Sequence, residues 1–168
     1  LQRLLDDERL AAATGLAPER LPERLKVIHQ RLLEVRAERI RPATDDKVLT
    51  AGNALALIAF AEAARYLARP DYLAIAQANA RFLLEQLVVQ GRLLRAWRAG
   101  QARHSAYLED HAALILGLLA LYQSDSNPEW YRRALWLANE MKAHYRDPRG
   151  GFFDTRDDAE ALLFRPKD

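Results

Sequence analysis

The chain has 168 residues, half of them hydrophobic and 29% charged, which is the balance of one globular domain and not of a disordered segment. The net charge is only +2, and the basic residues are scattered among acids, so we expect no nucleic-acid binding. The absence of cysteine excludes disulfides, thiolate nucleophiles and cysteine-based metal sites within the chain.

Targeting signals are not visible in the sequence. Residues 1–10 carry charges throughout, unlike a signal peptide, and no apolar run approaches the roughly 18 residues that span a bilayer. We therefore expect no membrane insertion and a cytoplasmic location, which the lack of disulfides also fits. The chain starts at Leu1 and not at Met, which predicts that it is a portion of a longer protein.

The first part of the chain predicts two helices. Residues 1–14 are charged and Ala-rich, and we expect a frayed helix there. Residues 19–40 carry apolar side chains at every third or fourth position, which is the pattern of one helix face: Leu21, Leu25, Ile28, Leu32 and Val35. Pro42 ends this helix, because the residue before a proline avoids the helical conformation.

The next segments predict a buried helix, an amphipathic helix and a strand. Residues 51–68 are apolar nearly all round, as in a helix that is buried on most sides. A helix over about 70–89 begins at Pro70, a favourable first helical residue, and has one apolar stripe and one polar face. Residues 93–97 follow Gly91 and read as a short strand that turns at Ala99-Gly100.

The pattern then repeats. Residues 112–121 are again apolar all round, and Asn127-Pro128 opens a second amphipathic helix. Pro70 aligns with Pro128, and Asn53 with His111, at one offset of 58 residues. An inner buried helix paired with an outer amphipathic helix, repeated, is typical of an α/α toroid or solenoid. We expect one all-α domain over residues 1–168, with short β-hairpins between repeats. A plain helical bundle is the alternative.

Polar clusters occupy the same place in both repeats, at the start of each inner helix: residues 44–53 and 104–111. Inner helices of a toroid run parallel, so these ends are expected to meet at one rim and to line a shared cavity. Helix N-termini also favour anionic groups.

In the first cluster, Asp46 is a candidate general acid or base. Asp45, Lys47 and Asn53 are candidate substrate contacts, with Lys47 orienting a substrate oxygen. The alternative is structural: Asp46 or Thr50 caps the helix, Lys47 pairs with a carboxylate, and Asn53 is a satisfied buried amide.

In the second cluster, Glu109, Asp110 and His111 are candidate catalytic residues, with His111 suited to proton transfer near neutral pH. Tyr107 and Trp97 are candidate platforms for a sugar ring. The alternative makes the two acids capping residues and the aromatic and imidazole rings core residues. The four histidines lack ligand spacing, and no HExxH or glycine-rich phosphate loop occurs, so we expect neither a metal nor a cofactor.

Several motifs resemble one known family. The run Asp45-Asp46-Lys47-Val48-Leu49-Thr50, followed by Asn53, resembles the DDKVLTxWNGL segment of the YyaL-type, thioredoxin domain-containing proteins, a family that includes the relatives of spermatogenesis-associated protein 20. Four further segments match in order, and the resemblance covers about residues 15–168: residues 91–95, 107–112, 150–153 and 165–168. The chain departs from the pattern at Gly52 and Ala54, where the family has Trp and Gly.

The resemblance implies a thioredoxin-like domain followed by an (α/α)6 toroid of the six-hairpin glycosidase type, whose relatives act on carbohydrates. The chain would be an internal part of that toroid, with the rest of the parent chain as its partner and a sugar as the ligand of its rim. A non-catalytic helical-repeat scaffold or protein-interaction module is the alternative. An open toroid fragment exposes apolar helix faces, so we also expect self-association into a homo-oligomer.

Overall fold

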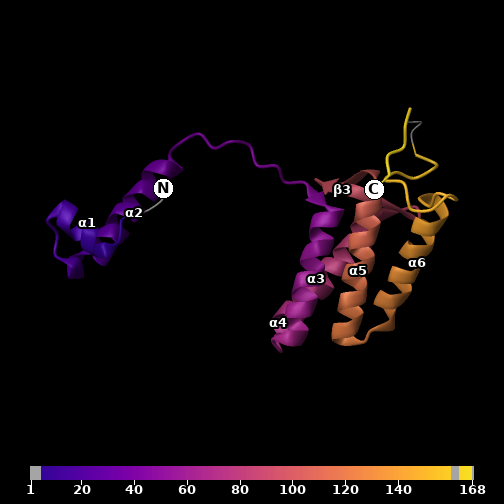
Figure 1. Ribbon diagram of the computed structural model, residues 1–168, viewed down its shortest axis with the longest axis horizontal. Coiled ribbons are helices and arrows are strands. Elements are labelled where there is room, and N and C mark those ends of the chain that lie inside the picture. Colours follow the sequence, from indigo (N-terminus) through magenta and orange to yellow (C-terminus); the bar gives the residue numbers. More distant parts are fainter. Residues whose placement is uncertain (1–4, 160–162, 168) are drawn as a thin grey trace. The chain divides into compact units, whose positions relative to one another are not determined.

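A computed structural model describes residues 5–159 and 163–167 of the chain (Figure 1). They fall into two compact units, Leu1–Thr44 and Asp45–Asp168, and each is described by itself. The expectation of one domain over residues 1–168 stays a prediction. Along the described residues, no helix is both long and apolar enough to cross a bilayer.

The first unit contains α1 (Asp7–Thr14), a 3₁₀ turn η1 (Pro18–Arg20) and α2 (Leu21–Ala37). The side chain of Asp6 caps α1 by accepting from the backbone N–H of Arg9 at 2.8 Å, and Gly15 ends the helix in the left-handed conformation. Both predicted helices are confirmed. The apolar face of α2 is nevertheless mostly uncovered, because Leu21 is its only described buried residue while Ile28, Leu32 and Val35 are exposed.

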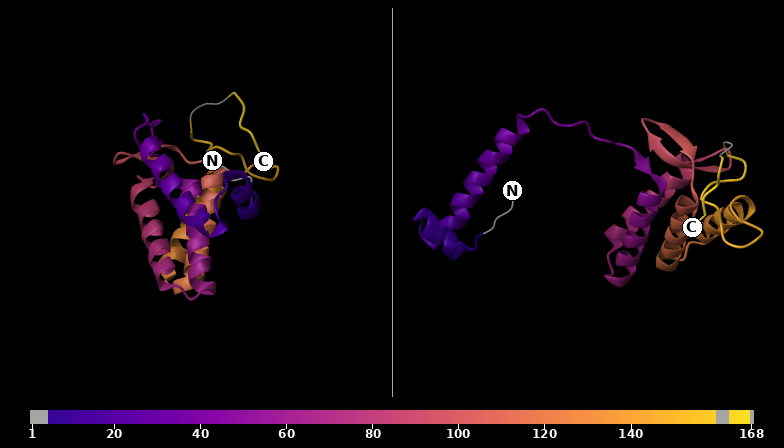
Figure 2. Two further views of the ribbon diagram at one scale, coloured as in Figure 1. Left: turned by 90° about the vertical axis from the view of Figure 1, so that its left-hand side faces the viewer. Right: turned by 45° about the horizontal axis from the view of Figure 1, so that its top comes forward.

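The second unit holds two helical hairpins. Its helices are α3 (Thr50–Tyr66), α4 (Pro70–Gln86), α5 (Leu108–Asp125) and α6 (Pro128–His144). The inner helices α3 and α5 pack against each other, and the outer helices α4 and α6 cover them (Figures 1 and 2). The inner helices start 108 − 50 = 58 residues apart and the outer ones 128 − 70 = 58 residues apart, which confirms the predicted repeat.

The core lies between these four helices. Buried residues of both outer helices contribute to it, and Ala76 of α4 and Ala134 of α6 occupy equivalent positions of the repeat. The inner helices approach closely at Gly117, where an added Cβ would lie 2.9 Å from Leu57 Cδ2. Burial is one-sided, however, because Leu55 on α3 and Leu116 on α5 are 60% and 59% exposed. The inner helices are thus covered on fewer sides than their composition predicts.

A small antiparallel sheet lies at one end of the hairpins, so the all-α prediction is corrected to a mostly helical fold with a sheet. Its strands are β1 (Val48–Leu49), β2 (Val88–Val89), β3 (Arg92–Arg98) and β4 (Gln101–Ser105). β3 pairs with the other three strands. The predicted strand and the β-hairpin between the repeats are confirmed. Ala99 and Gly100 both have positive φ at the β3–β4 turn, as a two-residue type I′ connection requires.

The second repeat carries a weaker version of this arrangement. The segment after α6 forms isolated bridges between Arg146 and Phe152 and between Phe153 and Lys167. They occur at the Gly150-Gly151-Phe152-Phe153 motif, the counterpart of the residues that open β3 in the first repeat.

Candidate functional site

One buried carboxylate joins the first turns of the two inner helices. Asp110 Oδ1 on α5 accepts a hydrogen bond from the backbone N–H of Ala51 on α3 at 3.0 Å. Its Oδ2 accepts from the backbone N–H of Tyr107 at 2.9 Å, which caps its own helix. The two amino ends therefore meet, as the sequence predicted for a shared rim.

Asp110 is only 1% exposed, and burial raises its pKa against the opposing effect of its hydrogen bonds. Thr50, also buried, donates from its hydroxyl to the carbonyl of Leu94 at 2.7 Å and so ties the start of α3 to β3. These contacts fix the rim to the sheet as well as to the neighbouring helix.

Arg95 on β3 gathers the second cluster. Its Nη1 donates to Glu109 Oε1 at 2.7 Å and to Asp110 Oδ2 at 3.1 Å. Its guanidinium carbon lies 4.4 Å from the centre of the Tyr107 ring, at cation–π distance. The Tyr107 ring is partly exposed, and the Glu109 side chain is 61% exposed. An acid, a cation and an aromatic face are thus presented together at the solvent boundary.

A cavity of about 510 Å³ opens beside this cluster. Its polar lining combines cationic, hydroxyl and aromatic groups, namely Arg95, His104, Ser105, Tyr107, Thr155 and Arg156. Such a cavity matches the size range of small-ligand sites, in which a few polar groups orient the ligand.

The first cluster lies at a second cavity of about 580 Å³, which His104 also lines. Asp46, Lys47 and Trp97 line it. Asp46 pairs with Arg98 at 2.5 Å, and Lys47 pairs with Asp45 at 3.3 Å, so the acids of this cluster are engaged with cations. The fold therefore separates the predicted residues into two neighbouring groups and does not gather them in one pocket.

Trp97 packs edge-on against Phe82, with ring centroids 5.3 Å apart. Its indole Nε1 is buried and has no hydrogen-bond partner among the described residues. A buried donor without an acceptor carries a desolvation cost.

The remaining predicted residues lie within the helices. Asn53 Nδ2 donates to the carbonyl of Leu49 at 2.9 Å. His111 is 1% exposed, its Nδ1 lies 3.3 Å from the carbonyl of Tyr107, and its ring centre lies 5.0 Å from that of Tyr145. Burial lowers the pKa of His111, which favours the neutral ring.

Three further residues belong to the rim, and none of them was given a role from the sequence, although His104 lies within the polar cluster 104–111. Arg95 lies on a strand whose pattern gave no sign of which side faces the helix ends. His104 lines both cavities and has a φ of 63°, a backbone conformation that is unusual outside glycine. Arg156 is buried and pairs with Glu140 at 3.2 Å and Asp158 at 2.8 Å. It comes from the segment after α6, which the sequence marks only by turn residues.

The comparisons with known proteins fit this architecture. No protein-family model matches the chain. It is 32% identical to mouse spermatogenesis-associated protein 20 over 86% of its own length, and 30% identical to the human protein over the same share. The chain spans only 20% of each of these relatives.

Solved structures with a similar fold include a cellobiose 2-epimerase from Spirochaeta thermophila. It matches with a TM-score of 0.59 at 20% identity, over 64% of this chain and 28% of that one. A sugar epimerase from a ruminal bacterium matches with a TM-score of 0.58 at 13% identity, over 67% and 31% of the two chains. At these identities the likeness concerns the fold alone: the chain matches part of an (α/α)6 toroid. Over most of its length, the chain is a homologue of a segment of spermatogenesis-associated protein 20.

Proposed function

We propose that the chain supplies part of the carbohydrate-binding rim of a six-hairpin glycosidase-like domain. The observation that carries the proposal is the Asp110 bridge between α3 and α5, which holds the amino ends of two inner helices beside the cavity of Arg95, His104 and Tyr107. Similar folds occur in proteins described as sugar epimerases, which supports a carbohydrate ligand.

The rim residues divide into two roles in this proposal. Tyr107 and Glu109 are exposed, so the ring offers a sugar the face that Arg95 does not cover. The Glu109 carboxylate, whose Oε1 accepts from Arg95, offers its second oxygen for proton transfer or for a hydroxyl contact. Asp110 and His111 are buried and act as positioning residues, since both make contacts that fix the start of α5. Arg95 links the two groups.

The proposal includes a larger assembly. The chain spans a fifth of its curated relatives, and the expected partners of the rim are further helical hairpins and a thioredoxin-like domain of a parent protein. A half-built pocket would bind a sugar weakly, because only some of the contacts of the complete site are present.

A second function is favoured by a different observation. The carboxylate of Asp110 is fully engaged by backbone and guanidinium donors, and Asp46 is paired with Arg98. Acids that are engaged in this way suit a non-catalytic helical-repeat scaffold that binds another protein.

Thermal-shift screening of the chain against mono- and disaccharides, beside full-length mouse spermatogenesis-associated protein 20, separates the two functions. A shift with the same sugar in both proteins, lost in the Tyr107→Ala variant of the chain and kept in Tyr131→Ala on the outer helix α6, supports the carbohydrate rim. No shift in either protein supports the scaffold.

A further inference from the structure

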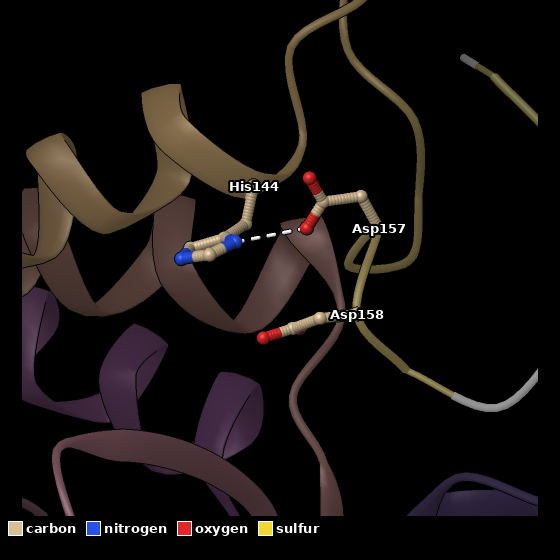
Figure 3. Close-up of side chains that lie close together, drawn as sticks. All are labelled: His144, Asp157 and Asp158. Carbon is tan, nitrogen blue, oxygen red and sulfur yellow. Dashed lines mark hydrogen bonds and ion pairs between the residues drawn. The ribbon is translucent and has the colours of Figure 1, made fainter.

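A second group of titratable side chains lies at the carboxyl end of α6 and is linked to the rim cavity through Arg156. His144 ends that helix, while Asp157 and Asp158 belong to the segment that follows it. This segment is hydrogen-bonded to the end of α6, since the backbone N–H of Asp157 donates to the carbonyl of His144 at 3.0 Å. Figure 3 shows the imidazole and the two carboxylates turned toward one another.

We propose that His144, Asp157 and Asp158 form a Zn²⁺ site. One nitrogen or oxygen of each residue lies within 4.8 Å of the others. Zinc–ligand distances are about 2.0–2.2 Å, so one ion between these atoms reaches all three after small side-chain adjustments. His144 Nδ1 and Asp157 Oδ1 are 2.8 Å apart, and an ion would replace this contact with two coordination bonds.

The residue that contacts the second nitrogen of His144 is of the type found next to ligating histidines in protein metal sites. A ligating imidazole nearly always directs its other nitrogen at a carboxylate or carbonyl, which fixes the tautomer. Here His144 Nε2 lies 3.8 Å from Glu140 Oε2, one turn earlier on α6. With Nδ1 on the ion, the proton sits on Nε2 and faces that carboxylate. The carboxyl end of a helix also favours a cation.

Arginines compete for one of the ligands. Asp158 Oδ1 accepts from Arg156 Nε at 2.8 Å, and Asp158 Oδ2 accepts from Arg92 Nη2 at 2.7 Å. Asp158 Oδ2 also accepts from Arg156 Nη2 at 3.3 Å, so both of its lone-pair sites are occupied. Oδ1 accepts a single N–H, from Arg156 Nε, and keeps its second lone-pair site for an ion. The same arginines then orient Asp158, since ligating carboxylates are themselves hydrogen-bonded.

The charges and ligand types select the ion. One imidazole and two carboxylates mix nitrogen with oxygen, which suits zinc better than the all-oxygen shells of Ca²⁺ or Mg²⁺. With three protein ligands, the fourth coordination position of the zinc ion would be open to solvent. Because Asp157 and Asp158 lie beyond the helix, the ion would fasten the segment after α6 to the end of that helix.

Equilibrium dialysis of the EDTA-treated chain against ZnCl₂ tests the proposal. We expect about one ion per chain, and at least tenfold weaker binding in His144→Ala and in Asp157→Asn, as ligand and outer-shell losses commonly give. His29→Ala, on the exposed surface of α2, is the matched control and should bind as the parent does. Binding that His144→Ala leaves unchanged, or no stoichiometric binding, overturns the site.

A second measurement on the unchanged chain avoids the folding of variants. Nitrogen-detected NMR of the imidazoles should show the His144 ring move to the Nε2–H tautomer on addition of ZnCl₂, while His29 and His104 are unaffected. If the His144 ring does not respond to Zn²⁺, the proposal fails and the cluster is an ion-pair network only.

Discussion

The Asp110 side chain of one inner helix accepts a hydrogen bond from the backbone N–H of Ala51 in the first turn of the other, although the two residues lie 59 positions apart in the chain. One carboxylate therefore serves as the cap of two helices. This contact sets the spacing of the rim and explains why an acid occurs at a position that is 1% exposed.

Replacement of Asp110 by alanine tests how much this carboxylate contributes to the stability of the fold. It removes the acceptor for the backbone N–H groups of Ala51 and Tyr107 and for Arg95. Buried donors without partners are costly, so we expect a loss of about 2–4 kcal/mol in the free energy of unfolding, measured by urea denaturation at pH 7. Glu109→Gln is the control, and its exposed ion pair should change stability by less than about 1 kcal/mol. Similar losses in both variants would contradict the bridge.

A larger side chain at position 117 should destabilise the protein. A Cβ at this position would lie 2.9 Å from Leu57 Cδ2 and 3.1 Å from the Ala54 carbonyl oxygen, so the two inner helices would have to separate. We expect Gly117→Ala to lower stability by about 1–3 kcal/mol in spite of the better helix propensity of alanine. Gly52→Ala meets open space in the first turn of α3 and should be neutral or stabilising. Thermal unfolding followed by circular dichroism distinguishes the two, and a stabilised Gly117→Ala protein would be inconsistent with the close approach.

His111 predicts a specific pH dependence. Burial is the largest influence and holds its pKa below the ordinary 6.5, so the unfolded chain binds this proton more readily than the folded one. The contribution of His111 is fully present above pH 6.5 and is lost as the pH falls toward the folded-state pKa. Urea titrations at several pH values between 7.5 and 5 should give a shallower loss of stability in His111→Gln than in the parent. An unchanged slope in His111→Gln would count against a buried neutral ring.

The open faces of the inner helices predict self-association. Leu55 and Leu116 are large apolar side chains that stay more than half exposed. We expect light scattering to show concentration-dependent dimers or larger species, and the double variant Leu55→Lys/Leu116→Lys to reduce them. Leu135→Lys on the outer helix α6 is the control. A parent chain that stays monomeric at high concentration would refute this expectation.

Much of the fold was predictable because the spacing of apolar residues along the chain reflects which helix faces are buried. The 58-residue offset between Pro70 and Pro128 located both hairpins, and the glycines at positions 91 and 100 located the ends of β3. The resemblance predicted exposed apolar helix faces, but the pattern did not identify Leu55 and Leu116 as the exposed residues, since an apolar helix looks the same whether its neighbours are inside or outside the chain.

The site was harder to predict because its partners are distant in sequence. The pattern placed Asp110 at a helix start but could not show that Ala51 would share its carboxylate. Arg95 was missed because strand pairing decides which residues of β3 meet the start of α5. Asp157 and Asp158 were missed as neighbours of His144 because their approach depends on the fold of an irregular segment after α6.

Saturation-transfer NMR of the chain with a panel of mono- and disaccharides tests the central proposal most directly, because it detects the weak binding expected of a partial site. The carbohydrate-rim account predicts transfer to at least one sugar, lost in Tyr107→Ala and retained in Tyr131→Ala. No transfer to any sugar, or equal transfer in both variants, would contradict a sugar-binding role for the rim.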